Sequence, residues 1–181
     1  MTRQMPKSQK RIINAFIEMR KTMPLEKLSV TKLCQKADVN KSTFYVYYHD
    51  IYDLSLELES QLVDNIVTSI RDPKLIISDV YTFSKQLHRA YQQQKEMLTI
   101  LFSDSRSASL PEQIFDSICE IYYKMRPESR YDLHTKIILE YSIYGGYYSF
   151  KNHLNDDSEY ISNIIADLSS RALQDEDIKK E

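Results

Sequence analysis

Residues 39–50, VNKSTFYVYYHD, bring a lysine, a serine, a threonine, a phenylalanine and three tyrosines into one short stretch. Lys41 can donate hydrogen bonds to guanine N7 and O6, and serine or threonine hydroxyls can bind bases or phosphates. Val46 offers a methyl surface to thymine, while Tyr45 and Tyr47 each offer a flat ring with a hydroxyl group suited to phosphate. These side-chain types suit the edge of a DNA groove.

The spacing of the aromatic residues separates a buried face from an exposed one. At about 100° per residue, Phe44 and Tyr48 share one face of a helix, with Val39 preceding them in a turn. We expect that face to pack against neighbouring helices. The side chains left pointing outward or lying at the margins are Lys41, Ser42, Thr43, Tyr45, Val46 and Tyr47.

Three helices are expected to position this face. Apolar spacing predicts the first over residues 7–21. Ser29 is expected to cap a second helix over residues 30–37, and Asn40 to cap a third that reaches about Tyr48. Two short helices joined by a three-residue turn suggest a helix-turn-helix.

The charge of the chain is divided by position. Residues 1–50 hold ten Lys and Arg against four Asp and Glu, whereas residues 51–181 hold 14 against 22. The net charge of −2 is therefore a basic head of +6 on an acidic body of −8. A small helical subdomain with a solvated polar face is the alternative interpretation, but the basic charge and the helix layout favour DNA binding.

The stretch SVTKLCQKADVNKSTFYVYYHDIYDL, residues 29–54, resembles the helix-turn-helix signature of the TetR family of bacterial transcriptional regulators. The shared pattern is a short helix ending at Ala37, Thr-Phe-Tyr at 43–45, an aromatic pair at 47–48, and a capped helix containing Leu54. The resemblance is specific over about residues 7–60, and beyond them it rests on helix order alone.

The resemblance implies an all-α homodimer with about nine helices per chain. Residues 1–50 would form the DNA-binding domain, and residues 51–181 a larger helical domain for effector binding and dimerisation. The positions that match base and phosphate contacts of the family are Lys41, Ser42, Thr43, Tyr45 and Tyr47, and those that match backbone contacts are Ser29, Thr31 and Lys32.

The sequence departs from the family pattern at three positions. Asp38 stands where glycine is usual in the turn, and Asp tolerates a left-handed backbone better than most residues do. Ser42 replaces a second common glycine. Ile51 stands where a lysine often binds phosphate at the start of the fourth helix.

Both glycines of the protein lie in one expected helix, within IILEYSIYGGYYSFKNHL at 137–154. Each costs a helix interior roughly 1 kcal/mol relative to alanine. The small residues Ser142, Gly145, Gly146 and Ser149 share a face, which indicates a close helix crossing. We expect a dimer interface that also includes Ile161 and Ile165 of the next helix; a crossing within one subunit, or a kink, is the alternative.

A ligand pocket is expected among the helices that follow the basic head. Its candidate lining residues are Tyr81, His88, Met97, Phe102, Phe115, Tyr122 and Tyr144. Aromatic and methionine side chains at helical spacing are more often plain core, so the sequence identifies no effector.

Other classes of protein find little support. The sequence has no phosphate-binding glycine loop, nucleophile elbow or HExxH motif, and its four histidines are scattered. We therefore expect no catalytic activity, no bound metal ion and no cofactor. No apolar run is long enough for a membrane span. Cys34 and Cys119 are expected to be buried reduced thiols of a cytoplasmic protein.

The sequence thus predicts a ligand-responsive regulator, most simply a repressor, that binds operator DNA as a homodimer. The alternative is a protein–protein interaction module or coactivator that keeps the fold and has lost DNA reading. Its support is Ile51 and the missing turn glycine.

Overall fold

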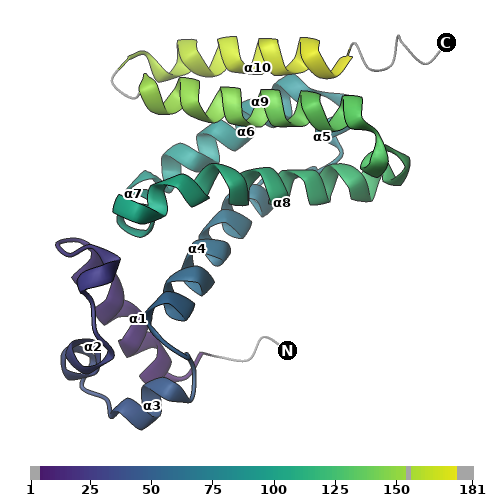
Figure 1. Cartoon of the computed structure of the whole chain (residues 1–181). Coiled ribbons are helices and arrows are strands. Elements are labelled where there is room, and N and C mark those ends of the chain that lie inside the picture. Colours follow the sequence, from purple (N-terminus) through teal and green to yellow (C-terminus); the bar gives the residue numbers. More distant parts are fainter. Residues whose placement is uncertain (1–4, 154–155, 175–181) are drawn as a thin grey trace. The chain divides into compact units, whose positions relative to one another are not determined.

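The computed structural model describes residues 5–153 and 156–174, and in this part of the chain the secondary structure is entirely helical (Figure 1). It contains ten α-helices, so the expected all-α class is confirmed. The chain after Pro73 forms two successive helices, α5, Leu75–Ser78, and α6, Val80–Gln93. The division falls at Asp79, whose carboxylate accepts a hydrogen bond from the Thr82 amide at 3.0 Å and so caps α6.

The helices divide between two compact units. The first takes the described residues within Met1–Leu62 and Glu96–Ala108, and the second those within Val63–Lys95 and Ser109–Glu181. The expected division of function at residue 50 remains a prediction.

The first unit contains α1, Lys7–Arg20; η1, Leu25–Lys27; α2, Val30–Ala37; and α3, Lys41–Tyr45. It also contains the first part of α4, Ile51–Thr68, most of α7, Lys95–Leu101, and the short turn η2, Asp104–Ala108. Its core joins these elements through fully buried apolar side chains, among them Ile12, Phe16, Leu33, Phe44, Tyr48 and Leu54. Burial of these side chains fixes the orientation of the short helices, which would be marginal alone.

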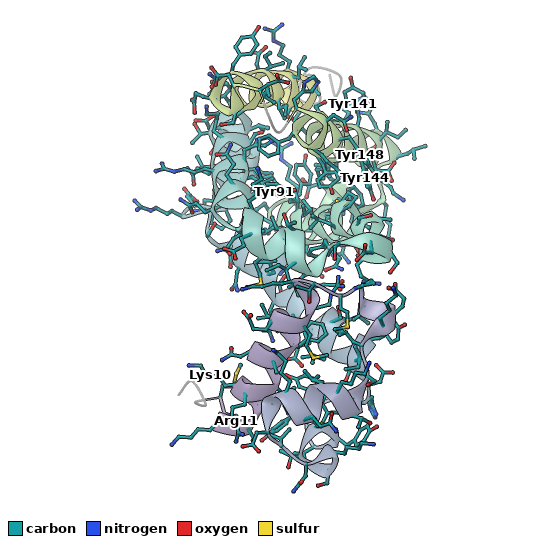
Figure 2. All side chains as sticks on the ribbon, turned by 90° about the vertical axis from the view of Figure 1, so that its left-hand side faces the viewer. Lys10, Arg11, Tyr91, Tyr141, Tyr144 and Tyr148 are labelled. Carbon is teal, nitrogen blue, oxygen red and sulfur yellow. The ribbon has the colours of Figure 1, made fainter. Side chains whose placement is uncertain are left out.

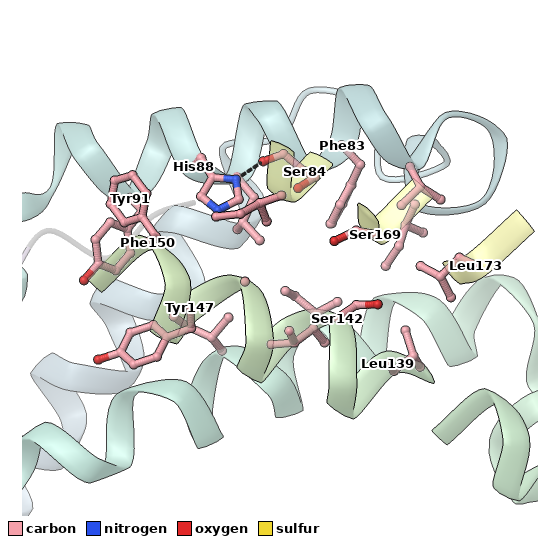
Figure 3. Close-up of a pocket in the computed structure, with 18 of the residues that line it drawn as sticks. Phe83, Ser84, His88, Tyr91, Leu139, Ser142, Tyr147, Phe150, Ser169 and Leu173 are labelled. Atoms are coloured by element: carbon pink, nitrogen blue, oxygen red, sulfur yellow. Dashed lines mark hydrogen bonds between the residues drawn. The ribbon is translucent and has the colours of Figure 1, made fainter. Parts of the chain in front are cut away.

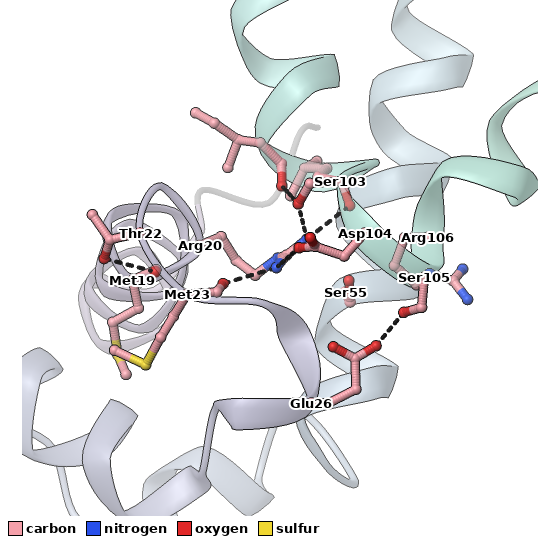
Figure 4. A network of polar contacts seen from close by, with 12 residues as sticks. Met19, Arg20, Thr22, Met23, Glu26, Ser55, Ser103, Asp104, Ser105 and Arg106 are labelled. Carbon is pink, nitrogen blue, oxygen red and sulfur yellow. Dashed lines mark hydrogen bonds and ion pairs between the residues drawn. The ribbon is translucent and has the colours of Figure 1, made fainter.

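Polar contacts bind the segment 96–108 to α1 and α4 inside the first unit (Figure 4). Arg20, whose side chain is fully buried, donates to the Ser103 hydroxyl at 2.6 Å and to the Met23 carbonyl at 2.9 Å. Arg106 binds the buried carboxylate of Glu59, which also accepts from Ser55 at 2.7 Å. No local sequence pattern predicts this network, because its members lie far apart along the chain.

The second unit contains α5, α6, the rest of α4 and four further elements: α8, Ser109–Met125; η3, Pro127–Tyr131; α9, Leu133–Asn152; and α10, Ser158–Gln174. α10 packs along both α6 and α9, and α9 packs on α8. Buried side chains at these contacts include Phe83, Ile118, Tyr122, Leu139, Phe150 and Ile165.

Candidate functional site

α3 and the turn that follows it carry the expected DNA-reading face, which consists of Lys41, Ser42, Thr43, Tyr45, Val46 and Tyr47. Phe44 and Tyr48 are almost completely buried, as their spacing predicts. Lys41 and Ser42 are exposed, Tyr45 is 57% exposed and Val46 is 75% exposed. A valine this exposed contributes little to the core.

Two local details differ from the expectation. α3 ends at Tyr45 instead of near Tyr48, and residues 46–47 form a turn. Asn40 precedes the helix, but its side chain makes no capping hydrogen bond. The helix is held mainly by the burial of Phe44, with Thr43 only partly exposed on its flank.

Tyr47 is tied to α1 and is only partly exposed. Its hydroxyl lies 2.8 Å from Ser8 Oγ, and the neighbouring Tyr48 hydroxyl accepts from Gln9 Nε2 at 3.1 Å. The ring of Tyr47 is therefore oriented by the first turn of α1, and its hydroxyl reaches a phosphate only by sharing or exchanging this bond. Ser8 and Gln9 join the site although no sequence signal pointed to them.

The turn between α2 and α3 is fixed by a charged pair. Asp38 has φ 51° and ψ 55°, the left-handed conformation for which glycine is the usual choice. Arg11 donates to the Asp38 carbonyl and also pairs with its carboxylate. Asp38 therefore maintains the left-handed turn, as expected. Its carboxylate also pairs with Arg11, so this cation of α1 is already engaged within the protein.

The start of α2 lies at the opposite end of that helix from this turn. Ser29 caps α2 by accepting from the Lys32 amide at 3.4 Å, and the side chains of Thr31 and Lys32 are exposed. Ile51, by contrast, is 5% exposed and packs into the core, so this position supplies no cation at the start of α4.

Exposed lysines give the first unit its positive surface. Those without an ion-pair partner among the described residues are Lys7, Lys10, Lys27, Lys32, Lys36 and Lys41. Figure 2 shows Lys10 and Arg11 extending outward from α1. Free ammonium groups of this kind bind phosphates through counterion release, which needs no fixed geometry.

The second unit contains a partly open cavity of about 90 Å³ among α6, α8, α9 and α10 (Figure 3). α6 contributes Val80, Phe83, Ser84, Leu87, His88 and Tyr91, and α9 contributes Leu139, Ser142, Ile143, Gly146, Tyr147 and Phe150. Both sets have the spacing i, i+3, i+4, i+7, i+8, i+11, which is one complete helix face over three turns.

Two polar groups stand out in this lining. His88 Nδ1 lies 2.8 Å from the Ser84 carbonyl, and its ring packs against Phe150 with centroids 5.4 Å apart. Burial lowers the pKa of His88, so the imidazole is neutral at pH 7. The buried Ser142 hydroxyl has no hydrogen-bond partner among the described residues.

Only His88 of the expected pocket residues lines this cavity. Met97 and Phe102 belong to the first unit, and the half-exposed Tyr81 donates to Asn163 at 3.0 Å. Phe115 stacks on Tyr144 with centroids 5.5 Å apart, and Tyr122 borders a smaller hollow near Ile76. The residues missed were Phe83, Tyr91, Tyr147 and Phe150, and the matching spacing on the two helices was the signal that could have found them.

The small residues of α9 are divided between its inner and outer sides. Gly146 lies against Ile165 of α10 in the same chain, and an added Cβ would come 3.1 Å from the Ile165 γ2 methyl group. Ser142 and Ile165 also face inward, whereas Gly145 and Ser149 are exposed and Ile161 is half-buried. The close crossing within one chain thus accounts for Gly146.

A separate apolar stripe is exposed on α9 and α10. Its members are Leu133, Ile137, Tyr141 and Tyr148 on α9, and Tyr160, Ile164 and Leu168 on α10. The members on α10 are spaced by four residues, so they share one helix face. Figure 2 shows Tyr141, Tyr144 and Tyr148 along α9. Large exposed apolar stripes of this kind are typical of protein–protein interfaces.

Within residues 5–153 and 156–174, no group of His, Cys, Asp or Glu side chains is arranged to hold a metal ion. None of the helices described there combines the length and apolar character needed to cross a bilayer.

Comparison with known proteins identifies the fold. A solved structure named dihydroxyacetone kinase operon activator DhaS aligns with a TM-score of 0.58 and 17% identity, covering 92% of this chain and 96% of that one. The fatty acid degradation regulator FadR from Bacillus halodurans aligns with a TM-score of 0.55 and 17% identity, covering 93% and 96%. No protein-family model and no curated protein matches the sequence. The chain therefore shares its all-helical fold with proteins named as regulators.

Proposed function

We propose that this protein is a sequence-specific DNA-binding transcriptional regulator, acting as a homodimer and most simply as a ligand-responsive repressor. The observation that carries the proposal is the exposed, polar surface of α3 within a unit rich in unpaired lysines. The all-helical fold shared with an operon activator and a degradation regulator supports it, because regulators are built on this framework.

The side chains of α3 would supply sequence recognition in the major groove. Lys41 and Ser42, in the first turn, would reach base edges, while exposed Val46 would meet a thymine methyl group. Tyr45, with Thr31 and Lys32 at the start of α2, would contact the sugar–phosphate backbone. Backbone contacts of this type fix the register of the protein on the duplex.

A homodimer would place two such surfaces on one operator. Two half-sites read from the same side of DNA are about 34 Å apart, and a twofold pair of subunits matches that arrangement. The exposed apolar stripe of α9 and α10 is suited to this contact, with Gly145 and Ser149 on the neighbouring surface of α9. An effector in the cavity would change operator affinity by favouring one arrangement of the subunits.

Selection from a random oligonucleotide pool, followed by fluorescence anisotropy at several salt concentrations, tests the proposal. Wild-type protein is expected to enrich a two-part motif and to lose affinity steeply as salt rises. Lys41→Ala should reduce both affinity and the discrimination between bases, and Tyr45→Ala should weaken binding. Lys124→Ala is the matched control, because Lys124 is an exposed lysine of the second unit.

A protein–protein interaction module is the second candidate, and the burial of Ile51 favours it, since a phosphate contact is lost there. Enrichment of no motif, together with an intact cellular phenotype in the Lys41→Ala and Tyr45→Ala variants, would establish this candidate instead. Loss of the phenotype in both variants and not in Lys124→Ala would support DNA reading.

A further inference from the structure

The cavity of the second unit is lined by uncharged side chains among the described residues. Nineteen of these residues line it, and none of the nineteen is Asp, Glu, Lys or Arg. Moving a charged group from water into such surroundings is strongly unfavourable unless a partner charge or several hydrogen bonds compensate. The composition of the lining thus selects against anions and cations alike.

The arrangement of the lining residues favours an elongated occupant. The stripe on α6 runs from Val80 to Tyr91, a length of about 16 Å along a helix axis. Figure 3 shows α9 following the same course on the other side, with Tyr91 and Phe150 at one end and Leu173 at the other. The open volume of about 90 Å³ is smaller than the ~150 Å³ cavity that accepts benzene in a well-studied case, so the occupant must be small.

His88 places one hydrogen-bond acceptor in this apolar lining. The Ser84 carbonyl can only accept, so Nδ1 carries the proton and Nε2 of the neutral ring keeps its lone pair. Nε2 has no hydrogen-bond partner among the described residues. The Ser84 contact and the Phe150 ring hold the imidazole in place, so this acceptor is oriented before a ligand arrives.

Ser142 gives a second, independent indication of a missing polar partner. Its hydroxyl is buried in the lining without a hydrogen bond to any described residue, an arrangement that normally costs about 1–3 kcal/mol. Structures retain such groups where a ligand or water completes them.

We propose that the cavity binds an uncharged, elongated and mainly apolar small molecule whose hydroxyl group donates a hydrogen bond to His88 Nε2. The regulatory consequence of this binding rests on the proposed function. The binding itself does not. A carboxylate has no proton to donate and would face the lone pair of Nε2. An ammonium group can donate, but no anionic side chain of the lining would compensate its charge.

Isothermal titration of the protein alone with primary alkanols from butan-1-ol to octan-1-ol tests the ligand class. The matched carboxylates and amines of the same chain length serve as comparison probes at pH 7.5. We expect the alkanols to bind at least tenfold more tightly than either charged series, with affinity rising along the series until the slot is filled.

Two variants locate the site and its anchor. His88→Phe keeps an aromatic ring against Phe150 but lacks the acceptor, so alkanol affinity should fall by about tenfold, the factor of one ordinary hydrogen bond. His88→Gln retains an acceptor and should lose less. Ile143→Phe, at a half-buried lining position, should block all probes, and circular dichroism with thermal melting checks that each variant is folded.

Three results would overturn this ligand class: carboxylates or amines binding as tightly as the alkanols, equal alkanol affinity in His88→Phe and wild type, or no alkanol binding up to the solubility limit. These results are separate from DNA binding, because the titration contains no DNA. Alkanol binding without operator binding would contradict only the proposed function. Operator binding with a preference for charged probes would contradict only the proposed ligand class.

Discussion

Arg106 binds the carboxylate of Glu59 with two nitrogen atoms, Nη2 at 2.6 Å from Oε2 and Nε at 3.0 Å from Oε1. Glu59 is completely buried in α4, and Arg106 belongs to the segment that precedes α8. Bidentate pairing of this kind combines charge with fixed geometry. The contact therefore joins the segment 96–108 to α4 in the core of the first unit.

Breaking this pair should destabilise the first unit strongly. Glu59→Ala leaves the guanidinium of Arg106 without its buried counter-charge, a loss of about 3 kcal/mol or more. Urea unfolding followed by circular dichroism measures it. Glu120→Ala is the control, because it breaks the exposed Lys124–Glu120 pair and should leave the midpoint nearly unchanged. Equal midpoints for the two variants would contradict the structural role of Glu59.

The adjacent glycines of α9 should respond differently to alanine. An added Cβ at Gly145 meets nothing within 4 Å, so Gly145→Ala should raise the free energy of unfolding by about 0.5–1 kcal/mol. At Gly146 the new methyl group approaches Ile165, and the resulting repulsion should cancel part or all of that gain. Denaturant unfolding of both variants at low protein concentration checks the order. A larger gain at Gly146 would show that the packing against α10 is looser than described.

Both cysteines should resist alkylation in the native protein. Burial raises the pKa of Cys34, and burial with the nearby Asp116 carboxylate raises the pKa of Cys119 to about 12. A raised thiol pKa means that the unreactive thiol form dominates at pH 8. Iodoacetamide followed by mass spectrometry should find both unmodified in native protein and both modified in urea. Rapid labelling of Cys119 without denaturant would rule out this environment.

The apolar stripe of α9 and α10 should control self-association. Ile137→Lys places a charge within the stripe. Sedimentation equilibrium should therefore show that the affinity of dimerisation is at least tenfold lower than in wild type. Tyr52→Lys changes an exposed ring of the first unit, outside the stripe, and should leave association intact. A dimer unaffected by Ile137→Lys would place the interface elsewhere.

His88 should make the fold more sensitive to mild acid. Burial lowers its pKa, so below the ordinary value near pH 6.5 the unfolded chain binds more protons than the folded one. The free energy of unfolding therefore falls as pH decreases through that range, and recovers above it. Urea midpoints between pH 7.5 and 5.5 should decline less in His88→Phe than in wild type. Parallel curves would mean that the imidazole is solvated in the folded state.

Helical periodicity was sufficient to predict which side of α3 is buried. The spacing of Phe44 and Tyr48 predicted the buried side of α3. Asp38 was correctly expected to take the left-handed turn. Each of these is a local property, determined by residues within a few positions of one another.

The partners of each face were decided by the tertiary structure. Periodicity groups residues on a face of α9, but it does not say whether that face meets α10, a cavity or solvent. Gly146 proved to contact Ile165, while Tyr147 and Phe150 proved to line the cavity with His88. Likewise Tyr47 meets Ser8 across 39 positions and Arg106 meets Glu59 across 47. The sequence alone determined which side chains must be buried, because a helix face is defined by residues a few positions apart. Only the packing of the helices determined what each side chain contacts, because the neighbouring helix comes from a distant part of the chain.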